Sequence, residues 1–430
     1  MRVCVIGSGG REHALAHVLG RSAEVVVTPG NPGIPGSVDT PPEAIDANLY
    51  VVGPEAPLVD GLADRLRAAG RLVLGPGADG AQLEGSKSTM KELVAAAGVP
   101  TAAYGSFEEE EPALAFLRSL PGPWVVKTDG LAAGKGVLVT HDRREAEADV
   151  RAKLSGEAFG AAGRKVVIEE GLVGPELSLL AVCDGTRAVP LAPAQDFKLL
   201  GDGDTGPNTG GMGAYSPVPF AGDDVVGDVM DRFVEPTLYE LSRRGIDYRG
   251  ILYAGLMLTE EGPKLLEYNV RFGDPEAQVV LPRLDSDLLD LLGQAAAGRL
   301  RSDPRFAPGA AVTVVMASED YPAKPRTGDV IEGIDAAEST GATVFCAGVA
   351  AGDGAGGHVM SAGDGAGGHV MSRDLSGERL VTAGGRVLNV TGFGPSIADA
   401  RTQAYAAVDL IDWPGKQFRT DIAKEAAQAP

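Results

Sequence analysis

The stretch KTDGLAAGKGVLV, residues 127–139, combines two lysines with a glycine-rich turn and raises the question of a phosphate-binding loop. In a Walker A loop, four residues separate the first glycine from the Gly-Lys pair, and Ser or Thr follows the lysine. Here three residues separate Gly130 from Gly134, and Gly136 follows Lys135. The Walker A interpretation therefore fails on both counts.

The same stretch is better interpreted as a β-hairpin. Apolar residues predict strands over 124–127 and 136–139, so Lys127 ends the first strand and Lys135 lies in the turn. Two ammonium groups one hairpin apart can neutralise a polyphosphate, and the glycines allow the backbone to approach it. A surface hairpin without a ligand remains the alternative, although such turns seldom need two lysines.

Composition narrows the class of protein. The chain has 430 residues, of which 44% are hydrophobic, and this is typical of a soluble globular protein with two to four domains. The net charge of −21 disfavours nucleic acid and anionic membranes as partners, so small molecules are expected instead. Three cysteines, no apolar run of membrane-spanning length and an N-terminus without a signal-peptide pattern predict a cytoplasmic protein.

The first hundred residues alternate short apolar strands with helical stretches, which predicts a parallel α/β sheet. The expected strands are residues 3–6, 25–28, 49–52 and 72–74, and a helix that begins after Glu84 ends at Gly98 and Pro100. Between residues 40 and 49 there is room for only a vestigial helix.

Further along, strands dominate. The expected strands are residues 124–127, 136–139, 166–169, 177–182, 251–258, 264–269 and 311–317, with helices over 143–154 and 396–411. The undecapeptide AGDGAGGHVMS occurs at 351–361 and again at 362–372, and we interpret this duplication as a surface-loop insertion.

Near the N-terminus, VIGSGGREHAL (residues 5–15) predicts a strand, a glycine-rich turn and a helix. Free N–H groups at such a helix start bind phosphate. A dinucleotide fingerprint requires glycine where Glu12 stands, so a mononucleotide or sugar-phosphate site is favoured over NAD. A tight turn without a ligand is the alternative.

Two other stretches have the composition of binding segments. In VVIEEGLVGPELS (166–178) a strand ends in Glu169 and Glu170, and this end can offer backbone groups to an adenine and a carboxylate to ribose hydroxyls. DTGPNTGGMGAYSP (204–217) is too rich in Gly, Thr and Asn, and too long, for a simple turn.

The stretch KLLEYNVRFGDPEAQ, residues 264–278, predicts a metal site. Glu267 and Asn269 lie on one face of a strand, and their oxygens suit Mg²⁺ that also binds phosphate. Arg271 shares this face if the strand continues, and its guanidinium can bind a carboxylate or phosphate. Asp274 and Glu276 follow in a turn. A solvated charged loop is the alternative.

Together these motifs resemble the phosphoribosylamine–glycine ligase family of ATP-grasp enzymes. The resemblance covers the chain through GSGGREHAL, VVGPEAPLVDGL, EGSKSTMK, KTDGLAAGKGV, DTGPNTGGMGAYSP, EYNVRFGDPEAQ and GGRVLNVTG. It implies a multidomain α/β and α+β chain with an ATP-grasp fold, a Rossmann-like N-terminal (preATP-grasp) domain and a β-rich C-terminal domain. The implied parts are residues 1–100, a B lid over 101–172, a central A part over 173–305, and 306–430.

The resemblance also implies an activity. This is ligation of glycine to 5-phosphoribosylamine, which gives glycinamide ribonucleotide, ADP and phosphate through a glycyl phosphate, in purine biosynthesis. The implied cofactors are ATP with Mg²⁺ or Mn²⁺, and a monomer is expected. Leu199 stands where the family often has arginine, which affects the expected rate more than the reaction.

The site residues are carried over by motif. ATP is expected to contact Lys87, Lys127, Gly134, Lys135, Gly136, Glu169, Glu170, Leu172, Glu176 and Lys198. The substrates are expected to contact Gly9, Gly10, Arg11, Glu12, Asp196, Asn208, Thr209, Gly210, Met212, Arg271, Gly273, Asp274 and Glu276. Glu267 and Asn269 are the implied metal ligands, and Arg271, Lys127 and Lys135 are the implied catalytic residues.

Three alternatives compete with this interpretation. A different carboxylate–amine ligase of the ATP-grasp type is disfavoured by GSGGREHAL and RFGDPEAQ. A nicotinamide oxidoreductase is disfavoured by the missing third glycine. A non-catalytic nucleotide sensor would not need Glu267, Asn269 and both hairpin lysines.

Overall fold

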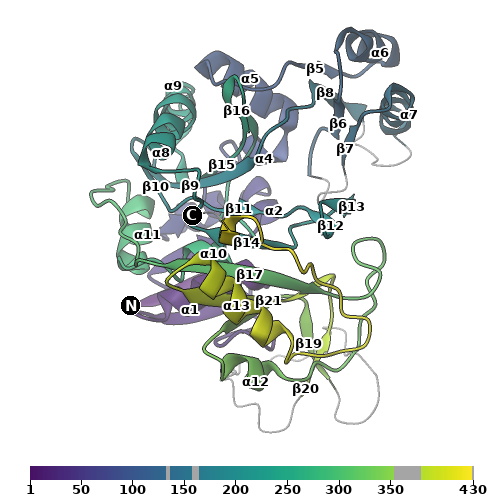
Figure 1. Cartoon of the computed structure of the whole chain (residues 1–430). Coiled ribbons are helices and arrows are strands. Elements are labelled where there is room, and N and C mark those ends of the chain that lie inside the picture. Colours follow the sequence, from purple (N-terminus) through teal and green to yellow (C-terminus); the bar gives the residue numbers. More distant parts are fainter. Residues whose placement is uncertain (132–135, 157–163, 353–378, 429–430) are drawn as a thin grey trace.

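A computed structural model describes residues 1–131, 136–156, 164–352 and 379–428 (Figure 1). The predicted parallel sheet at the N-terminus is confirmed. Its strands are β1 (Arg2–Gly7), β2 (Glu24–Pro29), β3 (Leu49–Val52) and β4 (Val73–Leu74), in the order β2-β1-β3-β4. Its neighbouring strands run parallel. The apolar residues of β1 and β3 are buried, as expected of a parallel sheet covered on both faces.

Short helices lie between and after its strands. They are α1 (Gly10–Leu19), α2 (Glu55–Val59), α3 (Leu62–Ala68), α4 (Gln82–Gly85) and α5 (Lys87–Ala97). Helix α5 begins at Ser86, whose hydroxyl accepts a hydrogen bond from the Thr89 N–H at 3.2 Å. It ends at Gly98, which has a positive φ of 70°. The vestigial helix is a 3₁₀ turn, Pro42–Ala44.

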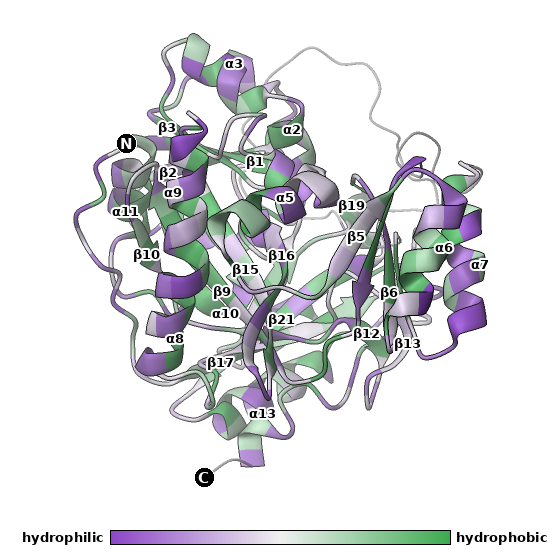
Figure 2. Cartoon of the chain, turned by 90° about the horizontal axis from the view of Figure 1, so that it is seen from above, coloured by the Kyte–Doolittle hydropathy of each residue, from purple (hydrophilic) through white to green (hydrophobic). Residues whose placement is uncertain are grey.

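A separate small sheet, here called the 104–170 sheet, contains the predicted hairpin. Its strands are β5 (Tyr104–Phe107), β6 (Trp124–Thr128), β7 (Val137–Thr140) and β8 (Val166–Glu170), in the antiparallel order β5-β8-β6-β7. Helices α6 (Glu110–Ser119) and α7 (Arg143–Leu154) cover its outer side, apart from the rest of the molecule (Figures 1 and 2). Strands β6 and β7 pair with Lys127 opposite Val137, which confirms the hairpin. Gly134 and Lys135 lie outside the described residues.

The central sheet is antiparallel and supports the site from one side. Its strands are β10 (Ala188–Pro190), β9 (Glu176–Asp184), β15 (Arg249–Thr259) and β16 (Gly262–Asn269), in that spatial order. The helices packed around it are α8 (Asp223–Val229), the π-helix η3 (Met230–Val234), α9 (Glu235–Arg243) and α11 (Leu288–Ala296). The short α10 (Ala277–Val280) follows the loop after β16.

The C-terminal sheet takes strands from two distant parts of the chain. Its order is β11 (Gln195–Asp196), β14 (Gly213–Ser216), β17 (Ala310–Ala317), β21 (Arg386–Gly394) and β18 (Thr343–Cys346). Strand β14 pairs antiparallel with β17, so segments from both sides of residue 306 share one sheet. Helices α12 (Ile334–Glu338) and α13 (Ile397–Val408) pack on this part (Figure 1).

Two hairpins extend from this framework. Strands β19 (Val349–Gly352) and β20 (Arg379–Thr382) pair with each other. Most of the duplicated undecapeptide falls between them and lies outside the described residues, so its interpretation as a loop insertion stays a prediction. The second hairpin, here called the 199–208 hairpin, joins β12 (Leu199–Gly201) to β13 (Thr205–Asn208).

Hydropathy follows this architecture, with apolar residues concentrated on the inner strands and polar residues on the outer faces of the helices (Figure 2). Within the described part of the chain, no helix is both long and apolar enough to cross a bilayer.

Candidate active site

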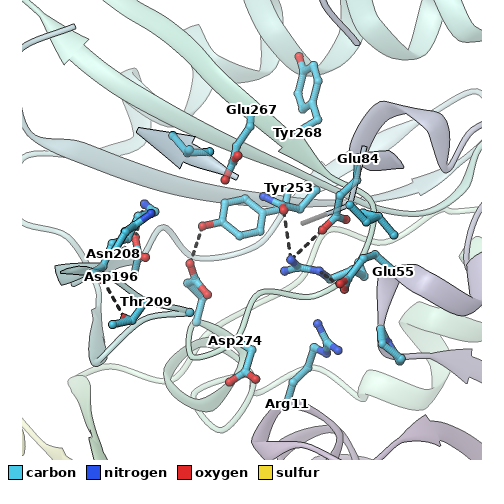
Figure 3. Close-up of a pocket in the computed structure, with 18 of the residues that line it drawn as sticks. Arg11, Glu55, Glu84, Asp196, Asn208, Thr209, Tyr253, Glu267, Tyr268 and Asp274 are labelled. Carbon is cyan, nitrogen blue, oxygen red and sulfur yellow. Dashed lines mark hydrogen bonds and ion pairs between the residues drawn. The ribbon is translucent and has the colours of Figure 1, made fainter. Parts of the chain in front are cut away.

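One cavity of about 510 Å³ lies where the N-terminal part, the 104–170 sheet, the central sheet and the C-terminal part meet (Figure 3). It brings together predicted residues from widely separated motifs. Those that line it are Arg11, Lys87, Gly136, Asp196, Lys198, Asn208, Thr209, Gly210, Glu267, Asn269, Arg271, Asp274 and Glu276. Four of the five motifs therefore contribute residues to one cavity, whereas the stretch 166–178 contributes none.

Other predicted residues do not line the cavity. They are Gly9, Gly10, Glu12, Lys127, Glu169, Glu170, Leu172, Glu176, Met212 and Gly273. Gly273 packs against one that does, because a Cβ there would lie 2.3 Å from Glu276 Oε2. The Met212 N–H donates to the carbonyl of Phe197, the neighbour of Lys198, at 2.7 Å. Glu170 accepts from the Ala103 N–H at 3.0 Å at the end of β8.

Behind the cavity, Glu169 lies between two lysines. Its Oε1 is 2.9 Å from Lys127 Nζ, and its Oε2 is 3.0 Å from Lys91 Nζ. Burial acts to lower the pKa of Lys127, but Glu169 and Glu267 outweigh it and raise that pKa. Burial lowers the pKa of Lys91 to about 8. Below that pH two cations meet one carboxylate, so this cluster carries net positive charge toward the site.

Lys87, at the first turn of α5, links the helix to the glycine-rich turn after β6. Its Nζ donates to the Gly130 carbonyl at 3.0 Å. Asp129 accepts from the N–H of Ser88 at 3.1 Å and from its hydroxyl at 2.6 Å. The turn that leads toward Lys135 is thereby held against the N-terminus of α5.

The predicted metal ligands lie at the end of β16. Glu267 and Asn269 both face the cavity, as their i, i+2 spacing requires. Asn269 Oδ1 accepts from Arg271 Nη2 at 3.1 Å, whereas the Glu267 carboxylate has no hydrogen bond or ion pair within the described part of the chain. A carboxylate and an amide oxygen fit Mg²⁺, which takes its remaining ligands from phosphate and water. No cluster of three or more His, Cys, Asp or Glu among residues 1–131, 136–156, 164–352 and 379–428 offers an all-protein alternative.

Arg271 is held by carboxylates that the sequence did not reveal. Its Nη2 is 2.8 Å from Glu84 Oε1, and its Nε is 3.5 Å from Glu55 Oε2. Burial acts to lower the pKa of Arg271, but Glu84 and Glu55 outweigh it and raise that pKa. The other Glu84 oxygen accepts from the Val270 N–H at 2.8 Å. The guanidinium is therefore permanently charged and fixed in orientation at the cavity wall.

Glu276 is a buried carboxylate at the cavity wall. Its Oε1 accepts from the Tyr253 hydroxyl at 2.5 Å, and Ser178 Oγ is 3.4 Å away. Burial raises the pKa of Glu276 to about 7, and the nearby Asp196 carboxylate adds to this rise. Glu276 can therefore exchange a proton near neutral pH.

Lys198 lies immediately before β12 and contacts two carboxylates. Its Nζ forms an ion pair with Glu176 and lies 3.0 Å from Asp196 Oδ1. Burial acts to lower the pKa of Lys198, but Asp196 and Glu176 raise it well above its ordinary value. In the described structure Glu176 thus contacts Lys198, and Lys198 faces the cavity.

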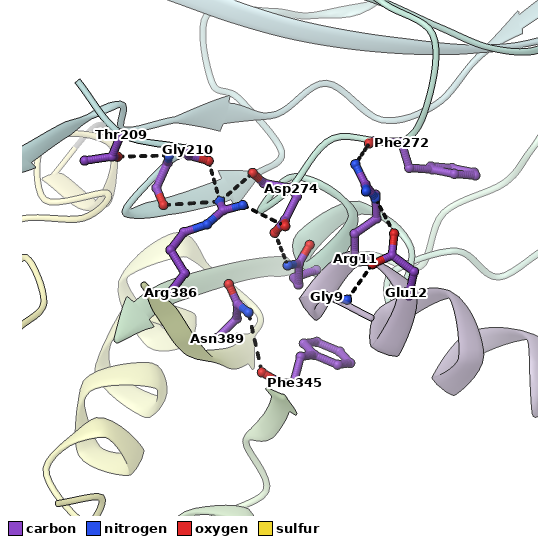
Figure 4. Close-up of polar contacts among 12 residues, drawn as sticks. Gly9, Arg11, Glu12, Thr209, Gly210, Phe272, Asp274, Phe345, Arg386 and Asn389 are labelled. Carbon is purple, nitrogen blue, oxygen red and sulfur yellow. Dashed lines mark hydrogen bonds and ion pairs between the residues drawn. The ribbon is translucent and has the colours of Figure 1, made fainter. Parts of the chain in front are cut away.

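Glu12 stands where a dinucleotide-binding turn would have its third glycine, and its side chain has a structural role there. Its carboxylate accepts from the Gly9 N–H at 2.6 Å and from Arg11 Nε at 2.6 Å (Figure 4). It therefore caps the start of α1 from within. A Cβ on Gly10 would lie only 2.2 Å from Asn389 Nδ2, so glycine is needed where α1 meets β21. Arg11 is left at the cavity wall.

Arg386 is a further residue that the sequence did not reveal. It begins β21, and its Nη2 is 2.8 Å from Asp274 Oδ2 (Figure 4). It also donates to the Gly210 carbonyl and, at 2.8 Å, to the Asp274 carbonyl. Burial acts to raise the pKa of Asp274, but Arg386 and Arg11 lower it. Asp274 therefore stays ionised between two arginines. Of the missed residues, Glu55, Glu84 and Arg386 stand within motifs that matched the family, whereas no motif marked Tyr253.

Models of known protein families match three parts of this chain. The N domain of phosphoribosylglycinamide synthetase matches residues 1–84, its ATP-grasp (A) domain residues 85–277, and its C domain residues 311–425. The chain belongs to the phosphoribosylglycinamide synthetase family. The expected ATP-grasp fold, with its N-terminal and C-terminal domains, is confirmed with it.

Relatives within the phosphoribosylglycinamide synthetase family align over the whole length. The phosphoribosylamine–glycine ligase of Mesorhizobium japonicum is 45% identical over 99% of this chain and 98% of its own. That of Rhizobium meliloti is 47% identical over 99% of both chains. The crystal structure of the ligase from Thermotoga maritima is similar at a TM-score of 0.82, with 34% identity over 98% of this chain and 100% of its own. The biotin carboxylase of Campylobacter jejuni, at 12% identity and a TM-score of 0.67, shares the fold alone.

Proposed function

We propose that this chain ligates glycine to 5-phosphoribosylamine and forms glycinamide ribonucleotide, ADP and phosphate, a step of purine biosynthesis. Membership of the phosphoribosylglycinamide synthetase family supports the proposal. The observation that carries it is the division of one cavity into two charged ends. Lys87 and Glu267 line one end, and Arg11 and Arg386 surround Asp274 at the other. One end suits ATP with its metal, and the other suits a phosphorylated sugar.

In the proposed reaction, a glycine carboxylate oxygen attacks the γ-phosphorus of ATP, and the bond to the β,γ-bridging oxygen breaks to release ADP. The product is glycyl phosphate. The amine of phosphoribosylamine then attacks the glycyl carbonyl carbon, the C–O bond to phosphate breaks, and the amine nitrogen loses a proton. Both steps bring anions together, so the site needs fixed cations more than a nucleophilic side chain.

Different residues are proposed to bind the ATP phosphates, the glycine carboxylate, the nucleotide and the metal. Lys87, Lys127 and Lys135 are proposed to stabilise the ATP phosphates, and Arg271 to hold the glycine carboxylate. Glu169, Glu170, Leu172, Glu176 and Gly136 remain the proposed surroundings of the nucleotide. Glu267 and Asn269 would hold Mg²⁺ or Mn²⁺, which supplies charge neutralisation at the phosphate oxygens. Lys135 and Gly134 are proposed from sequence alone.

Glu276 is proposed to accept the proton that the amine loses. It lines the cavity, and a carboxyl group with a pKa of about 7 is ionised in a large fraction of molecules at neutral pH. Its proton affinity is also matched to the operating pH, which favours general-base catalysis.

Replacing Tyr253 with Phe tests this role. The Tyr253 hydroxyl donates to the Glu276 carboxylate and so favours its ionised form. Without that donor the pKa of Glu276 rises, and the acidic limb of kcat/KM should move to higher pH by about one unit. The measurement is the pH profile of kcat/KM between pH 5.5 and 9, taken for both proteins. Tyr239→Phe, at an exposed tyrosine, is the matched control and should keep the wild-type profile. An unshifted acidic limb in Tyr253→Phe would remove Glu276 as the base.

The remaining expectations complete the proposal. We propose that the chain has four parts, residues 1–100, 101–172, 173–305 and 306–430. The second part, 101–172, acts as a lid over the nucleotide. We also propose a cytoplasmic monomer that acts on small molecules.

A coupled assay of ADP release tests the function. Turnover is expected only when glycine, phosphoribosylamine and Mg-ATP are present together. Omission of any one of the three is the internal control. Equal turnover with another amine or another amino acid would overturn the assignment.

A further inference from the structure

The 199–208 hairpin is poorly supported by its own strands. Strands β12 and β13 pair only with each other within the described residues, and all four residues of β13 are exposed. An isolated two-stranded hairpin is at best marginally stable in water. Something outside the hairpin must therefore hold it in place.

Arg419, near the C-terminus, reaches across to this hairpin. Its side chain is only 1% exposed. Its Nη1 donates to the Leu199 carbonyl at 3.1 Å and to Asp204 Oδ1 at 2.7 Å. Its guanidinium carbon also lies 5.0 Å from the ring centre of Phe197, just before β12. One buried cation thus contacts the root, the first strand and the turn of the hairpin.

The residues after Arg419 add a second set of contacts. The Thr420 N–H donates to Asp202 Oδ1 at 2.8 Å. Asp421 accepts from Arg419 through both oxygens at 2.7 Å and from the Gly203 N–H at 2.7 Å. Asp421 therefore orients the guanidinium and binds the turn at the same time.

Helix α13 holds this C-terminal segment from behind. The Tyr405 hydroxyl donates to the Arg419 carbonyl at 2.7 Å. Arg401 donates to the Thr420 carbonyl at 2.6 Å and to the Ile422 carbonyl at 2.9 Å. The segment 419–422 is therefore fixed to the C-terminal sheet through α13.

The residues that flank the clamped hairpin line the cavity. Lys198 precedes β12, and Asn208 ends β13. The Thr209 N–H donates to the Lys198 carbonyl at 2.8 Å, and Arg386 donates to the Gly210 carbonyl. The hairpin thus enters the end of the cavity that contains Arg11, Arg386 and Asp274.

We propose that Arg419 is a positioning residue that clamps the 199–208 hairpin, so that Asn208, Thr209 and Gly210 are preorganised to bind the phosphorylated sugar amine. The assignment of that ligand rests on the proposed function. Arg419 itself does not line the cavity. Arg419 raises the fraction of molecules whose hairpin is in the position that binds the sugar amine. If that fraction falls, the apparent affinity for the sugar amine falls in proportion.

Two variants and one control test the clamp. Arg419→Lys keeps the charge but cannot bind Leu199, Asp204 and Asp421 together. Asp204→Asn removes the negative charge of one partner, whose side chain is 67% exposed, and asparagine tolerates its positive φ of 53°. Arg326→Lys is the control, because Arg326 pairs with Glu319 and Asp329 and does not contact the hairpin.

Four quantities are measured for each protein: the KM for phosphoribosylamine, kcat, the melting temperature and the rate of hydrogen exchange over residues 199–208. Arg419→Lys is expected to raise that KM about tenfold and Asp204→Asn about threefold, with kcat changed by less than about twofold, because excess substrate restores the ordered hairpin. Exchange over 199–208 should accelerate in both variants while exchange in β17 stays unchanged. Arg326→Lys should match the wild type.

The outcomes separate the two proposals. A wild-type protein without turnover on glycine and phosphoribosylamine would contradict the proposed function, while hydrogen exchange still decides whether the clamp exists. If the wild type is active and Arg419→Lys exchanges faster with an unchanged KM, Arg419 has only a structural role. Unchanged exchange in both variants would also overturn the clamp.

Discussion

Replacing Glu267 with Gln is expected to lower kcat about a hundredfold or more at a Mg²⁺ concentration that saturates the wild type. Glutamine keeps the size of the side chain and an oxygen ligand but removes the negative charge. Because no other described residue hydrogen-bonds to this carboxylate, its loss should leave the fold intact. The measurement is kcat as a function of Mg²⁺ and of Mn²⁺, together with the melting temperature.

The matched control is Glu261→Gln, on the turn that joins β15 to β16. Its carboxylate is 78% exposed and pairs only with Lys264 within the described residues. Wild-type activity is expected there. Partial recovery of Glu267→Gln at high Mg²⁺ would support a ligand role, and wild-type kinetics at ordinary Mg²⁺ would exclude one.

Replacing Arg271 with Lys is expected to lower kcat/KM about 10²- to 10³-fold, the size of effect that follows the removal of one fixed donor from a reacting anion. Lysine keeps the positive charge, so the buried Glu84 retains a partner. It loses the planar fork that now reaches Glu84, Asn269 and the Phe272 carbonyl. The measurement is kcat and KM for glycine, because Arg271 is proposed to hold the glycine carboxylate.

Arg243→Lys controls for the change of residue type. Arg243 pairs with Glu240 on α9 and is 61% exposed, so its replacement should not alter kinetics. If Arg271→Lys changed the KM for ATP and left that for glycine unaltered, the guanidinium would belong to the nucleotide end of the site. Wild-type kinetics would remove Arg271 from the site altogether.

Local patterns predicted the elements of this fold well where a strand or helix has a strong signal of its own. Helix α7 has the predicted bounds, 143–154, and strands β1, β3 and β16 lie where apolar runs placed them. The edge strand β5 and the helices α6, α8 and α9 were not anticipated. Strand β5 (YGSF) is only half-buried and too short to show a periodicity. Its position is set by pairing with β8, which is distant in sequence.

The site residues likewise divide into those with a local signal and those whose role depends on distant segments. Glu267 and Asn269 were predictable because their relation is local, two positions apart on one strand. Glu84 and Arg386 were not, because their roles depend on packing between distant segments: Glu84 meets Arg271, and Arg386 meets Asp274. Their motifs matched the family, but no local pattern says which cavity a side chain will face. Glu276 illustrates a third case, since burial and the Tyr253 hydroxyl alter its proton affinity in a way that no spacing reveals.

The C-terminal sheet combines strands from distant parts of the chain, so it can be completed only late in the synthesis of the protein. Strand β14 leaves the ribosome well before β17, the strand that pairs with it. Until β17 is synthesised, β14 is an unpaired edge next to residues 208–210, and such edges favour association with other chains. Among the described residues that line the cavity, Arg386 emerges last, and Arg419 follows it. The cavity is therefore complete only after residue 386 has been translated, and a truncation before that residue removes part of the cavity while residues 85–277, the ATP-grasp (A) domain, are still present.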